Sequence, residues 1–314
     1  MTLTTTLSRL RSLNLSENAL QGSIPAAIPR GCTNLTLLDL SHNHLQGAIP
    51  LQFGAGMSNL TYLSLWKNNL SGEIPRSLAE LTSLQRLYLD LNMLSGEIPP
   101  ALGNLTSIIQ LYLQKNRLSG QIPSSLGQLR SVFDLQVGFN NLTGAIPTSI
   151  WNISSLKRFS VQYNMLTGTI PTNAFSALPR LRQLFMNNNL FHGYFPVSVA
   201  NASNMTLLQI DGNFFRGIIS PEIGRLKKLV VLLLDNNLFE AKEPKDWEFI
   251  TQLTNCSQLQ ELGLSSNRFG GVLPDSISNL STSLQILVLG NNKISGSIPE
   301  DVSRLISLRS LDFI

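Results

Sequence analysis

Charged residues are scarce in this sequence. Asp, Glu, Lys and Arg make up 13% of the 314 residues, about half of the share that is usual in soluble proteins. The net charge is +4, but the basic residues are scattered and form no run that could follow a phosphate backbone. We therefore expect no nucleic-acid partner. Hydrophobic residues make up 43% of the chain, which is enough for a core and excludes intrinsic disorder.

Long apolar runs are also missing. The longest purely aliphatic run extends from Leu229 to Leu234 and is far too short to cross a membrane. The first residues, MTLTTTLSRL, contain no apolar core of signal-peptide length. We therefore expect neither a signal peptide nor an anchor in this chain, and no direct membrane contact by this segment.

Residue types that commonly catalyse reactions or bind metals are few. The chain has three His and two Cys, and no Ser-His-Asp set or carboxylate cluster with metal-ligand spacing can be identified. The letters H-N-H at 42–44 match a nuclease motif only by chance, because Asn43 belongs to the regular repeat described below. Cys32 and Cys256 occupy the same repeat position nine repeats apart, which predicts two unpaired buried thiols. We predict no catalytic residue, no metal site and no cofactor.

A repeat with an asparagine in each unit is the dominant feature that is present. Successive units are 24 or 25 residues long, except for one of 30, and follow the pattern LxxLxLxxNxLxGxIP. The asparagines of this ladder are Asn18, Asn43, Asn68, Asn92, Asn116, Asn140, Asn164, Asn189, Asn213, Asn237, Asn267 and Asn292. Such a period predicts a solenoid. We interpret residues 1–314 as a single domain of twelve complete repeats and a truncated thirteenth that starts at Leu308.

The letters of one repeat have a physical explanation. The two leucines of LxL alternate with outward residues, as in a short strand whose leucines face the core. A buried Asn at the following turn can satisfy backbone groups of its own coil and of the next one. Gly permits a tight bend, and Pro starts the far side of the coil. There, apolar residues three apart, such as Leu126 and Leu129, predict a short 3-10 turn.

The LxxLxLxxNxL pattern resembles that of leucine-rich repeat proteins, and the LSGxIP letters after the Asn resemble the plant-specific subclass. The resemblance covers essentially the whole chain. It implies an α/β solenoid, a right-handed leucine-rich repeat superhelix with a parallel β-sheet on its concave face and short 3-10 turns on its convex face. The subclass includes ectodomains of plant receptor-like kinases and polygalacturonase-inhibiting proteins.

The long step between Asn237 and Asn267 contains an irregular insertion at residues 240–258, in which Ala241 replaces the usual glycine. Its letters DWEFITQL predict a helix with Asp246 as N-cap and Glu248 in the first turn. This insertion, together with SIWNISSL and PTNAFSALP, resembles the cereal receptor kinases related to the rice bacterial-blight resistance receptor. The resemblance implies a ligand-sensing ectodomain of an immune-type receptor, on the extracellular side of the plasma membrane.

Parts that such receptors normally carry are missing from this sequence. It has no cysteine-paired caps, no transmembrane helix and no kinase motif, so we expect no enzymatic activity. We expect the chain to be the ectodomain fragment of a plant receptor-like serine/threonine kinase in immune signalling. It would bind a peptide or protein ligand, and the resemblance implies a co-receptor kinase as a second partner. The alternatives are a secreted inhibitor or decoy of the polygalacturonase-inhibitor type and a nonfunctional truncated copy.

The outward positions of the strands are where a ligand would bind. Residues at these positions do not have to pack in the core. In repeats three to ten they include aromatic and charged residues, which are typical of a recognition surface. Strands also favour aromatic residues for structural reasons alone. The predicted ligand-binding residues are Trp66, Lys67, Tyr88, Asp90, Tyr112, Lys115, Phe139, Tyr163, Phe185, Asn187, Asp211 and Asp235.

Asn-x-Ser/Thr sequons occur eleven times, which suits a secreted glycoprotein. The repeat itself generates some of them, such as the NLS at Asn69 and the NLT at Asn141. Five sequons lie instead on the connection before a strand, outside the ladder corner, and are the predicted glycosylation sites: Asn34, Asn59, Asn104, Asn152 and Asn279.

Overall fold

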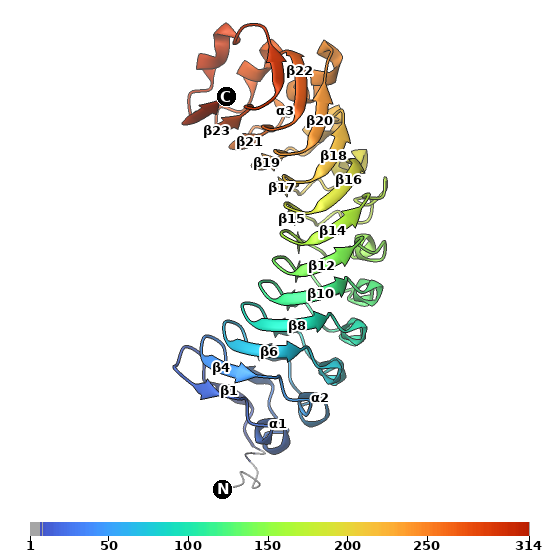
Figure 1. Ribbon diagram of the computed structural model, residues 1–314, viewed down its shortest axis with the longest axis vertical. Helices are drawn as coiled ribbons and strands as arrows, with labels where there is room; N and C mark the ends of the chain where they lie inside the picture. Colours follow the sequence, from blue (N-terminus) through green and yellow to red (C-terminus); the bar gives the residue numbers. More distant parts are fainter. Residues whose placement is uncertain (1–6, 8, 314) are drawn as a thin grey trace. The chain divides into compact units, whose positions relative to one another are not determined.

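The structure is a computed structural model that describes residue 7 and residues 9–313. The chain divides into two compact units, Met1–Leu156 and Lys157–Ile314, and each is a stack of parallel coils (Figure 1). A coil contributes a short strand to a first sheet and a second short strand to a second sheet. Most coils close with a helical turn on the side away from the strands.

In unit 1 the strands of the first sheet are β1 (Ser12–Asn14), β3 (Leu37–Asp39), β5 (Tyr62–Ser64), β7 (Arg86–Tyr88), β9 (Gln110–Tyr112) and β11 (Asp134–Gln136). Those of the second sheet are β2 (Gln21–Gly22), β4 (His44–Gly47), β6 (Asn69–Glu73), β8 (Met93–Glu97), β10 (Arg117–Gln121) and β12 (Asn141–Gly144). The helical turns are α1 (Ala27–Gly31), α2 (Phe53–Gly56), η1 (Arg76–Glu80), η2 (Pro100–Asn104), η3 (Ser124–Gln128) and η4 (Ile150–Asn152).

In unit 2 the strands of the first sheet are β13 (Arg158–Ser160), β15 (Gln183–Phe185), β17 (Leu207–Gln209), β19 (Val231–Leu233), β21 (Glu261–Gly263), β23 (Ile286–Val288) and β25 (Ser310–Asp312). Those of the second sheet are β14 (Met165–Gly168), β16 (Leu190–Tyr194), β18 (Phe214–Gly217), β20 (Leu238–Ala241), β22 (Arg268–Val272) and β24 (Lys293–Ser295). The helical segments are η5 (Val197–Asn201), η6 (Pro221–Arg225), η7 (Pro244–Trp247), α3 (Glu248–Leu253), η8 (Asp275–Asn279) and η9 (Glu300–Arg304).

The predicted solenoid of parallel strands and 3-10 turns is confirmed. Equivalent residues of neighbouring coils stand side by side in the first sheet, for example Leu63, Leu87 and Leu111. All three leucines have no exposed surface. A single coil cannot bury its own leucines, so the stacking of neighbours creates the core.

The ladder asparagines connect the coils as hydrogen-bonding bridges. Asn92 Nδ2 donates to the Leu89 carbonyl of its own coil (3.2 Å) and to the Leu65 carbonyl of the preceding coil (2.9 Å). Its Oδ1 accepts from the backbone N–H of Leu70, also in the preceding coil (3.0 Å). From the sequence, we expected the asparagine to bond backbone groups of the next coil, and that expectation was wrong. These groups belong to the preceding coil, because the Asn side chain points back toward the coil that the chain has just left.

The residue before each ladder asparagine adopts a left-handed backbone. Its φ lies between 51° and 56° in eleven coils, none of which has glycine there, and is 62° at Gly212 in the twelfth. This conformation costs a non-glycine residue roughly 1–2 kcal/mol, and the asparagine hydrogen bonds at the corner offset that cost. We call this position the corner residue; it includes Lys67, Lys115, Phe139 and Tyr163.

The second sheet was not anticipated from the sequence. Its strands are formed by segments such as LSGE, whose Ser and Gly have low strand propensity. They pair because the ladder asparagines hold successive coils in register, as in the pairing of Gly72 with Leu94. The glycine of this segment is required: Gly96 has a φ of 75°, and a Cβ there would lie 2.9 Å from Glu73 Cγ.

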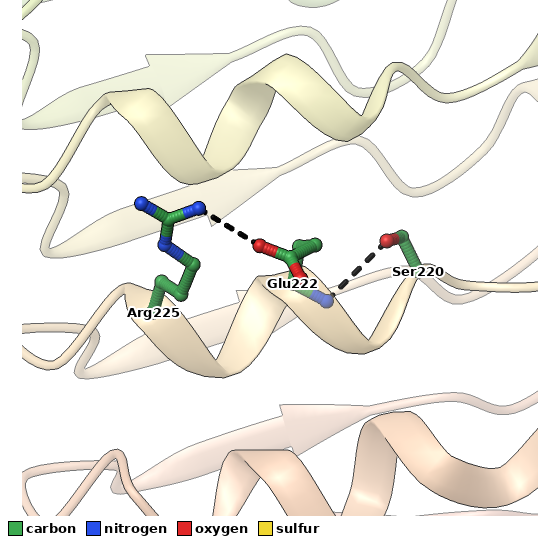
Figure 2. Close-up of polar contacts among 3 residues, drawn as sticks. All are labelled: Ser220, Glu222 and Arg225. Carbon is green, nitrogen blue, oxygen red and sulfur yellow. Dashed lines mark hydrogen bonds and ion pairs between the residues drawn. The ribbon is translucent and has the colours of Figure 1, made fainter.

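The helical side of the coils is held by local polar contacts. In η6 the Ser220 hydroxyl accepts from the Glu222 backbone N–H (3.3 Å), and Arg225 forms an ion pair with Glu222 (2.9 Å; Figure 2). Because this ion pair is exposed to solvent, its contribution to stability is small.

The insertion at 240–258 forms η7 followed by α3, so the predicted helix is present. Its predicted N-cap was wrong. Asp246 lies inside η7, where its carboxylate accepts from the backbone N–H groups of Lys242 (2.8 Å) and Glu243 (3.0 Å), and Glu243 is the N-cap of that turn. Trp247 occupies the N-cap position of α3. The acidic residues of the insertion are compatible with either Asp246 or Trp247 as the N-cap of α3. Because the 3-10 turn η7 precedes the α-helix, the N-cap position falls on Trp247.

Candidate functional site

The candidate ligand surface is the outward face of the first sheet together with the corner residues. Seven of the twelve predicted residues lie in unit 1: Trp66, Lys67, Tyr88, Asp90, Tyr112, Lys115 and Phe139. Five lie in unit 2: Tyr163, Phe185, Asn187, Asp211 and Asp235. Each set is described by itself.

Tyrosines form a row across three coils of unit 1. The ring of Tyr62 meets that of Tyr88 edge to face at 5.5 Å between centroids, and Tyr88 stacks on Tyr112 at 4.7 Å. Both geometries are favourable for aromatic pairs. The row therefore presents a continuous aromatic surface, and the half-buried rings need little further ordering when a ligand binds.

The hydroxyls of this row belong to a hydrogen-bonded network. Tyr88 donates to Gln110 Oε1 (2.7 Å), Gln110 Nε2 donates to the Tyr112 hydroxyl (2.9 Å), and Tyr112 donates to Asp134 Oδ2 (2.6 Å). Arg86 Nε also donates to Gln110 (3.1 Å). Burial, and for Tyr112 also the hydrogen bond to Asp134, raises the pKa of the Tyr88 and Tyr112 hydroxyls, so both remain protonated donors.

Corner residues give unit 1 exposed cations beside aromatic rings. Lys67 Nζ lies 5.9 Å from the centroid of the Trp66 ring, and Lys115 Nζ lies 5.5 Å from that of Phe139. Both lysines are exposed, and 36% of Phe139 is exposed. Because their left-handed backbone directs these side chains outward at the corner, they are the residues most accessible to a ligand.

Asp90 departs from the sequence prediction. It was expected to face outward, yet only 5% of it is exposed. The coils on either side cover it, and Gln114 Nε2 of the next coil donates to its Oδ2 (3.2 Å). Burial raises the pKa of its carboxyl to about 7, although the backbone and Lys115 act in the opposite direction. Asp90 can thus influence a ligand by its charge more readily than by direct contact.

In unit 2 the corner residue Tyr163 is the most exposed of the predicted set, at 48%. Phe185 is half-buried, and the Arg158 guanidinium lies 5.2 Å from the centroid of its ring. Asn187 is buried at 4% exposure, which contradicts the expected outward position for the same reason as at Asp90.

Two half-buried acids follow in the next coils of unit 2. Burial raises the pKa of Asp211, and the charge of Asp235 adds to this effect. Asp235 Oδ1 accepts from the backbone N–H (2.8 Å) and the hydroxyl (2.7 Å) of Ser265. A Cβ at Gly263 would come within 1.9 Å of Asp235 Oδ2, so a glycine is required there to leave room for the carboxylate.

Sequence reasoning missed several residues of this surface. Arg86, Gln110 and Asp134 connect the tyrosine row, and Gln114 binds Asp90. Arg86, Gln110 and Asp134 occupy the equivalent first position of neighbouring strands, and Gln114 is the equivalent of Asp90 one repeat later. The signal that could have identified them is complementary polar residues one repeat apart, such as Arg86 and Gln110.

The five predicted glycosylation asparagines, Asn34, Asn59, Asn104, Asn152 and Asn279, are all exposed. Asn59 Nδ2 lies 3.5 Å from Asn34 Oδ1, so the two sites are neighbours. Arg304 donates to Asn279 Oδ1 (3.3 Å). Exposure leaves these side chains open to modification.

The remaining chemistry of the described residues is limited. Among residues 7 and 9–313, no three or more His, Cys, Asp or Glu come together as metal ligands. Cys32 and Cys256 are free and buried, and burial raises the pKa of both thiols, that of Cys256 to about 11. Such thiols are poor nucleophiles at neutral pH. Within the described part of the chain, no helix has the length and apolarity that a bilayer crossing requires.

The sequence matches models of the leucine rich repeat over residues 33–94 and 257–313, and over 9–30 and 107–129, together just over half of the chain. A curated relative is the receptor kinase-like protein Xa21 of Oryza sativa subsp. japonica, 63% identical over 46 residues, which are 15% of this chain and 4% of the relative. The aligned part is thus a small fraction of that protein.

Solved structures extend the similarity to nearly the whole chain. The ectodomain of the Arabidopsis receptor kinase HAESA, in complex with an IDA peptide hormone, is 37% identical, with a TM-score of 0.89 over 98% of this chain and 50% of that one. The plant peptide hormone receptor RGFR1 in complex with RGF2 is 31% identical, with a TM-score of 0.87 over 97% of this chain and 51% of that one.

A second HAESA structure, with IDA and the co-receptor SERK1, is 29% identical and has a TM-score of 0.58 over 98% of this chain and 62% of that one. The chain therefore spans between half and two thirds of these three receptor chains. The matched regions are leucine-rich repeats and the ectodomains of receptors.

Proposed function

Since this chain belongs to the leucine-rich repeat family, with the sequence and fold of plant receptor-kinase ectodomains, we propose that it is the ligand-recognition segment of such a receptor and binds a peptide. The observation that carries the proposal is the surface of unit 1, where exposed corner lysines stand beside Trp66 and Phe139 above a row of hydrogen-bonded tyrosines. Relatives of the same fold are peptide-hormone receptors, which supports a peptide as the ligand class.

The roles of the individual residues follow from their positions. In unit 1 the exposed residues Lys67, Lys115 and Phe139, with the half-buried Trp66, would contact the peptide directly. In unit 2 the exposed Tyr163 would offer a contact of its own. Aromatic rings supply area at low entropic cost, and lysines orient charged groups. The half-buried Tyr88 and Tyr112 would form the floor in unit 1, with Asp90 setting the charge beneath it. In unit 2 the half-buried Phe185 would form the corresponding floor, with Asn187, Asp211 and Asp235 beneath it.

The proposal extends to cellular context. The segment would lie on the extracellular side of the plasma membrane as part of its parent receptor, with glycans on the five exposed connection sequons. A co-receptor kinase would join the complex, as supported by the HAESA structure with SERK1. An immune role rests on the likeness to Xa21 and on the insertion at 240–258.

Peptide binding can be tested without knowing the natural ligand. A random-peptide phage library would be panned against the purified chain, and the affinities of the enriched peptides would be compared between wild type and the triple variant Lys67→Ala, Lys115→Ala, Phe139→Ala. Corner positions tolerate alanine as well as the native residues, so folding should be unchanged. We expect the triple variant to lose at least about tenfold in affinity, equivalent to about 1.4 kcal/mol.

The matched control is the variant Arg117→Ala, Asn141→Ala, which changes exposed residues of the second sheet in the same unit. If the enriched peptides bind the corner variant as tightly as wild type, the first-sheet surface of unit 1 is ordinary sheet surface. A library that yields no peptide specific for the chain would contradict the peptide-binding proposal itself.

A further inference from the structure

Two acceptor oxygens beneath the ligand surface of unit 1 have no hydrogen-bond donor. They are Asp90 Oδ1 and Gln114 Oε1, and both are buried. A buried acceptor without a donor costs about 1–3 kcal/mol. Two such atoms on neighbouring coils, on side chains that already touch, call for an explanation.

The contact that exists fixes the orientation of both side chains. Gln114 Nε2 donates to Asp90 Oδ2 (3.2 Å), so Gln114 Oε1 is the other atom of the same amide and Asp90 Oδ1 is the other atom of the same carboxyl. Flipping the amide would bring Oε1 toward a carboxylate oxygen and would lose the bond. A proton on Asp90 Oδ1 would instead form an O–H group that donates to Gln114 Oε1. Neither oxygen would then lack a hydrogen-bond partner.

We propose that Asp90 and Gln114 form a proton-binding pair, in which Asp90 Oδ1–H donates to Gln114 Oε1 while Gln114 Nε2 donates to Asp90 Oδ2. The proton comes from solvent and returns to it, and no other bond is made or broken. The burial that raises the pKa of this carboxyl to about 7 supports the pair, because the neutral acid is favoured in such surroundings.

Charged and titratable groups surround the pair on each neighbouring coil. Lys67, on the preceding coil, bonds through its backbone N–H to the Asp90 carbonyl (3.0 Å). Tyr88 lies on the same coil, while Tyr112 and Lys115 lie on the next; Lys115 favours the carboxylate. When Asp90 is protonated, its carboxyl no longer offsets the positive charge of the two lysines, while Asp134, bonded to Tyr112, remains the neighbouring acid.

The same pair of residue types, with one unpartnered oxygen on each, occurs at the equivalent positions in unit 2. Asn187 Oδ1 and Asp211 Oδ1, at the equivalent positions of neighbouring coils, are also buried acceptors without a partner. Burial raises the pKa of Asp211 as well, with Asp235 as the neighbouring charge. An acid beside a carboxamide, with one orphaned oxygen on each, thus occurs in both units.

The pair makes the ligand surface respond to pH, and this consequence rests on the proposed peptide-binding function. Below about pH 7 the neutral Asp90 leaves a more positive surface, so a peptide with acidic groups binds more tightly. Above that pH the carboxylate offsets the lysines.

The proton site itself is tested on the chain without any ligand. Carboxyl carbons of aspartates labelled with carbon-13 would be followed by NMR between about pH 3 and about pH 9, in wild type and in Asp90→Asn. We expect one resonance that titrates near pH 7 and is absent from the variant. If every aspartate resonance titrates below about pH 5, as unperturbed carboxyls do, the proposal fails.

A stability measurement provides a second readout. The folded pKa of Asp90 lies above its unfolded value of about 3.9, so its stabilising effect is complete below that value and is lost as pH rises through about 7. In the Asp90→Asn variant the new side-chain amide would donate to Gln114 at every pH and mimic the protonated acid. We expect the urea midpoint of Asp90→Asn to exceed that of wild type at about pH 8 and to match it at about pH 4. If the difference between the two urea midpoints is the same at every pH, the proposed proton-binding pair is wrong.

Coupling to ligand is then measured with the acidic peptides enriched by panning. Wild type should bind them more tightly at about pH 5 than at about pH 8, and Asp90→Asn should lose that difference. If Asp90 titrates as proposed but the wild-type affinity does not change with pH, the coupling to ligand is refuted and the proton site stands. If no peptide is enriched, the peptide-binding proposal fails, while the ligand-free titration still decides the pair.

Discussion

The two units build the same second-sheet corner from different side chains. The position two residues after the ladder asparagine is leucine in unit 1, as at the buried Leu94 and Leu118, whereas four of the six coils of unit 2 place a buried phenylalanine there: Phe191, Phe215, Phe239 and Phe269. The rings of Phe191 and Phe215 lie 6.2 Å apart and those of Phe215 and Phe239 6.4 Å apart, both nearly parallel.

The exposed position just after the ladder asparagine differs as well. In unit 1 it includes Asn69, Arg117 and Asn141, all exposed and polar. In unit 2 it includes Met165, Leu190 and Phe214, which are 46%, 45% and 49% exposed. Three successive coils of unit 2 therefore present exposed apolar side chains at this position, where most coils of unit 1 present polar ones; further along unit 2 the position is again charged, with the exposed Arg268 and Lys293.

In one coil the larger buried rings accompany smaller side chains on the helical side. The coil that carries Phe191 and Phe195 has Val199 and Ala202 where η2 and the residue after it supply Leu102 and Leu105, and all four aliphatic side chains are buried. The comparison teaches that the repeat fixes the backbone's polar contacts, whereas the size of the side chains on either side of a coil can vary.

The largest expected effect is the loss of a stacked ring. Phe215→Ala should lower the free energy of unfolding by about 3–5 kcal/mol, and Leu94→Ala in unit 1 by about 2–5 kcal/mol, both measured by urea denaturation. Because Phe215 also contacts Phe195 edge to face, we expect Phe215→Ala and Phe195→Ala to be non-additive. If the double variant loses the sum of the two single losses in unfolding free energy, the two rings stabilise the protein independently of each other.

The ladder asparagines should behave alike in both units. Asn213→Ala and Asn92→Ala each leave a buried backbone N–H of the preceding coil, that of Phe191 or Leu70, without its acceptor. We expect each to cost about 2–3 kcal/mol. A cost that differs by more than about 1 kcal/mol between the two variants would show that side-chain volume also influences the backbone ladder.

The capping of η7, the turn that leads into α3, is a feature of unit 2 that has no counterpart among the described residues of unit 1. The backbone N–H groups of Lys242 and Glu243 lower the pKa of Asp246 by bonding its carboxylate. Its stabilising effect is therefore present above the unfolded pKa of about 3.9 and is lost as pH falls through the lower folded value. Asp246→Ala should melt at a lower temperature than wild type at about pH 6, and this difference should shrink at about pH 2. An unchanged difference would exclude the carboxylate as its source.

The exposed faces should give the smallest stability change. Phe214→Ser in unit 2 and Asn69→Ser in unit 1 should each alter stability by no more than about 0.5 kcal/mol. Phe214→Ser should nevertheless reduce binding of a hydrophobic fluorescent dye, whereas Asn69→Ser should not, because Phe214 is an exposed apolar ring and Asn69 is polar. Equal dye binding by the two variants would remove the contrast between the faces.

The sequence predicted the solenoid, its core leucines and its 3-10 turns, because each recurs in the same place and follows from local physics. It could not predict the second sheet, whose Ser- and Gly-containing strands pair only when neighbouring coils hold them in register. It also could not predict the burial of Asp90 and Asn187, since alternation assigns them outward and only the neighbouring coils cover them. The residues one repeat away that contact them, such as Gln114 for Asp90, can be recognised in the sequence only once that burial is known.

The direction of the asparagine bridges has a genetic consequence. Each bridge connects a coil only with the one before it, and the segments NNLSGEIP and NMLSGEIP mark the same corner of adjacent coils 24 residues apart. Unequal recombination between such near-identical stretches would remove or add one whole coil in frame. Every remaining asparagine would still find a carbonyl and an N–H at the same place on its new predecessor. A gene of this kind can therefore change the length of its recognition surface in single steps without passing through an unfolded intermediate form.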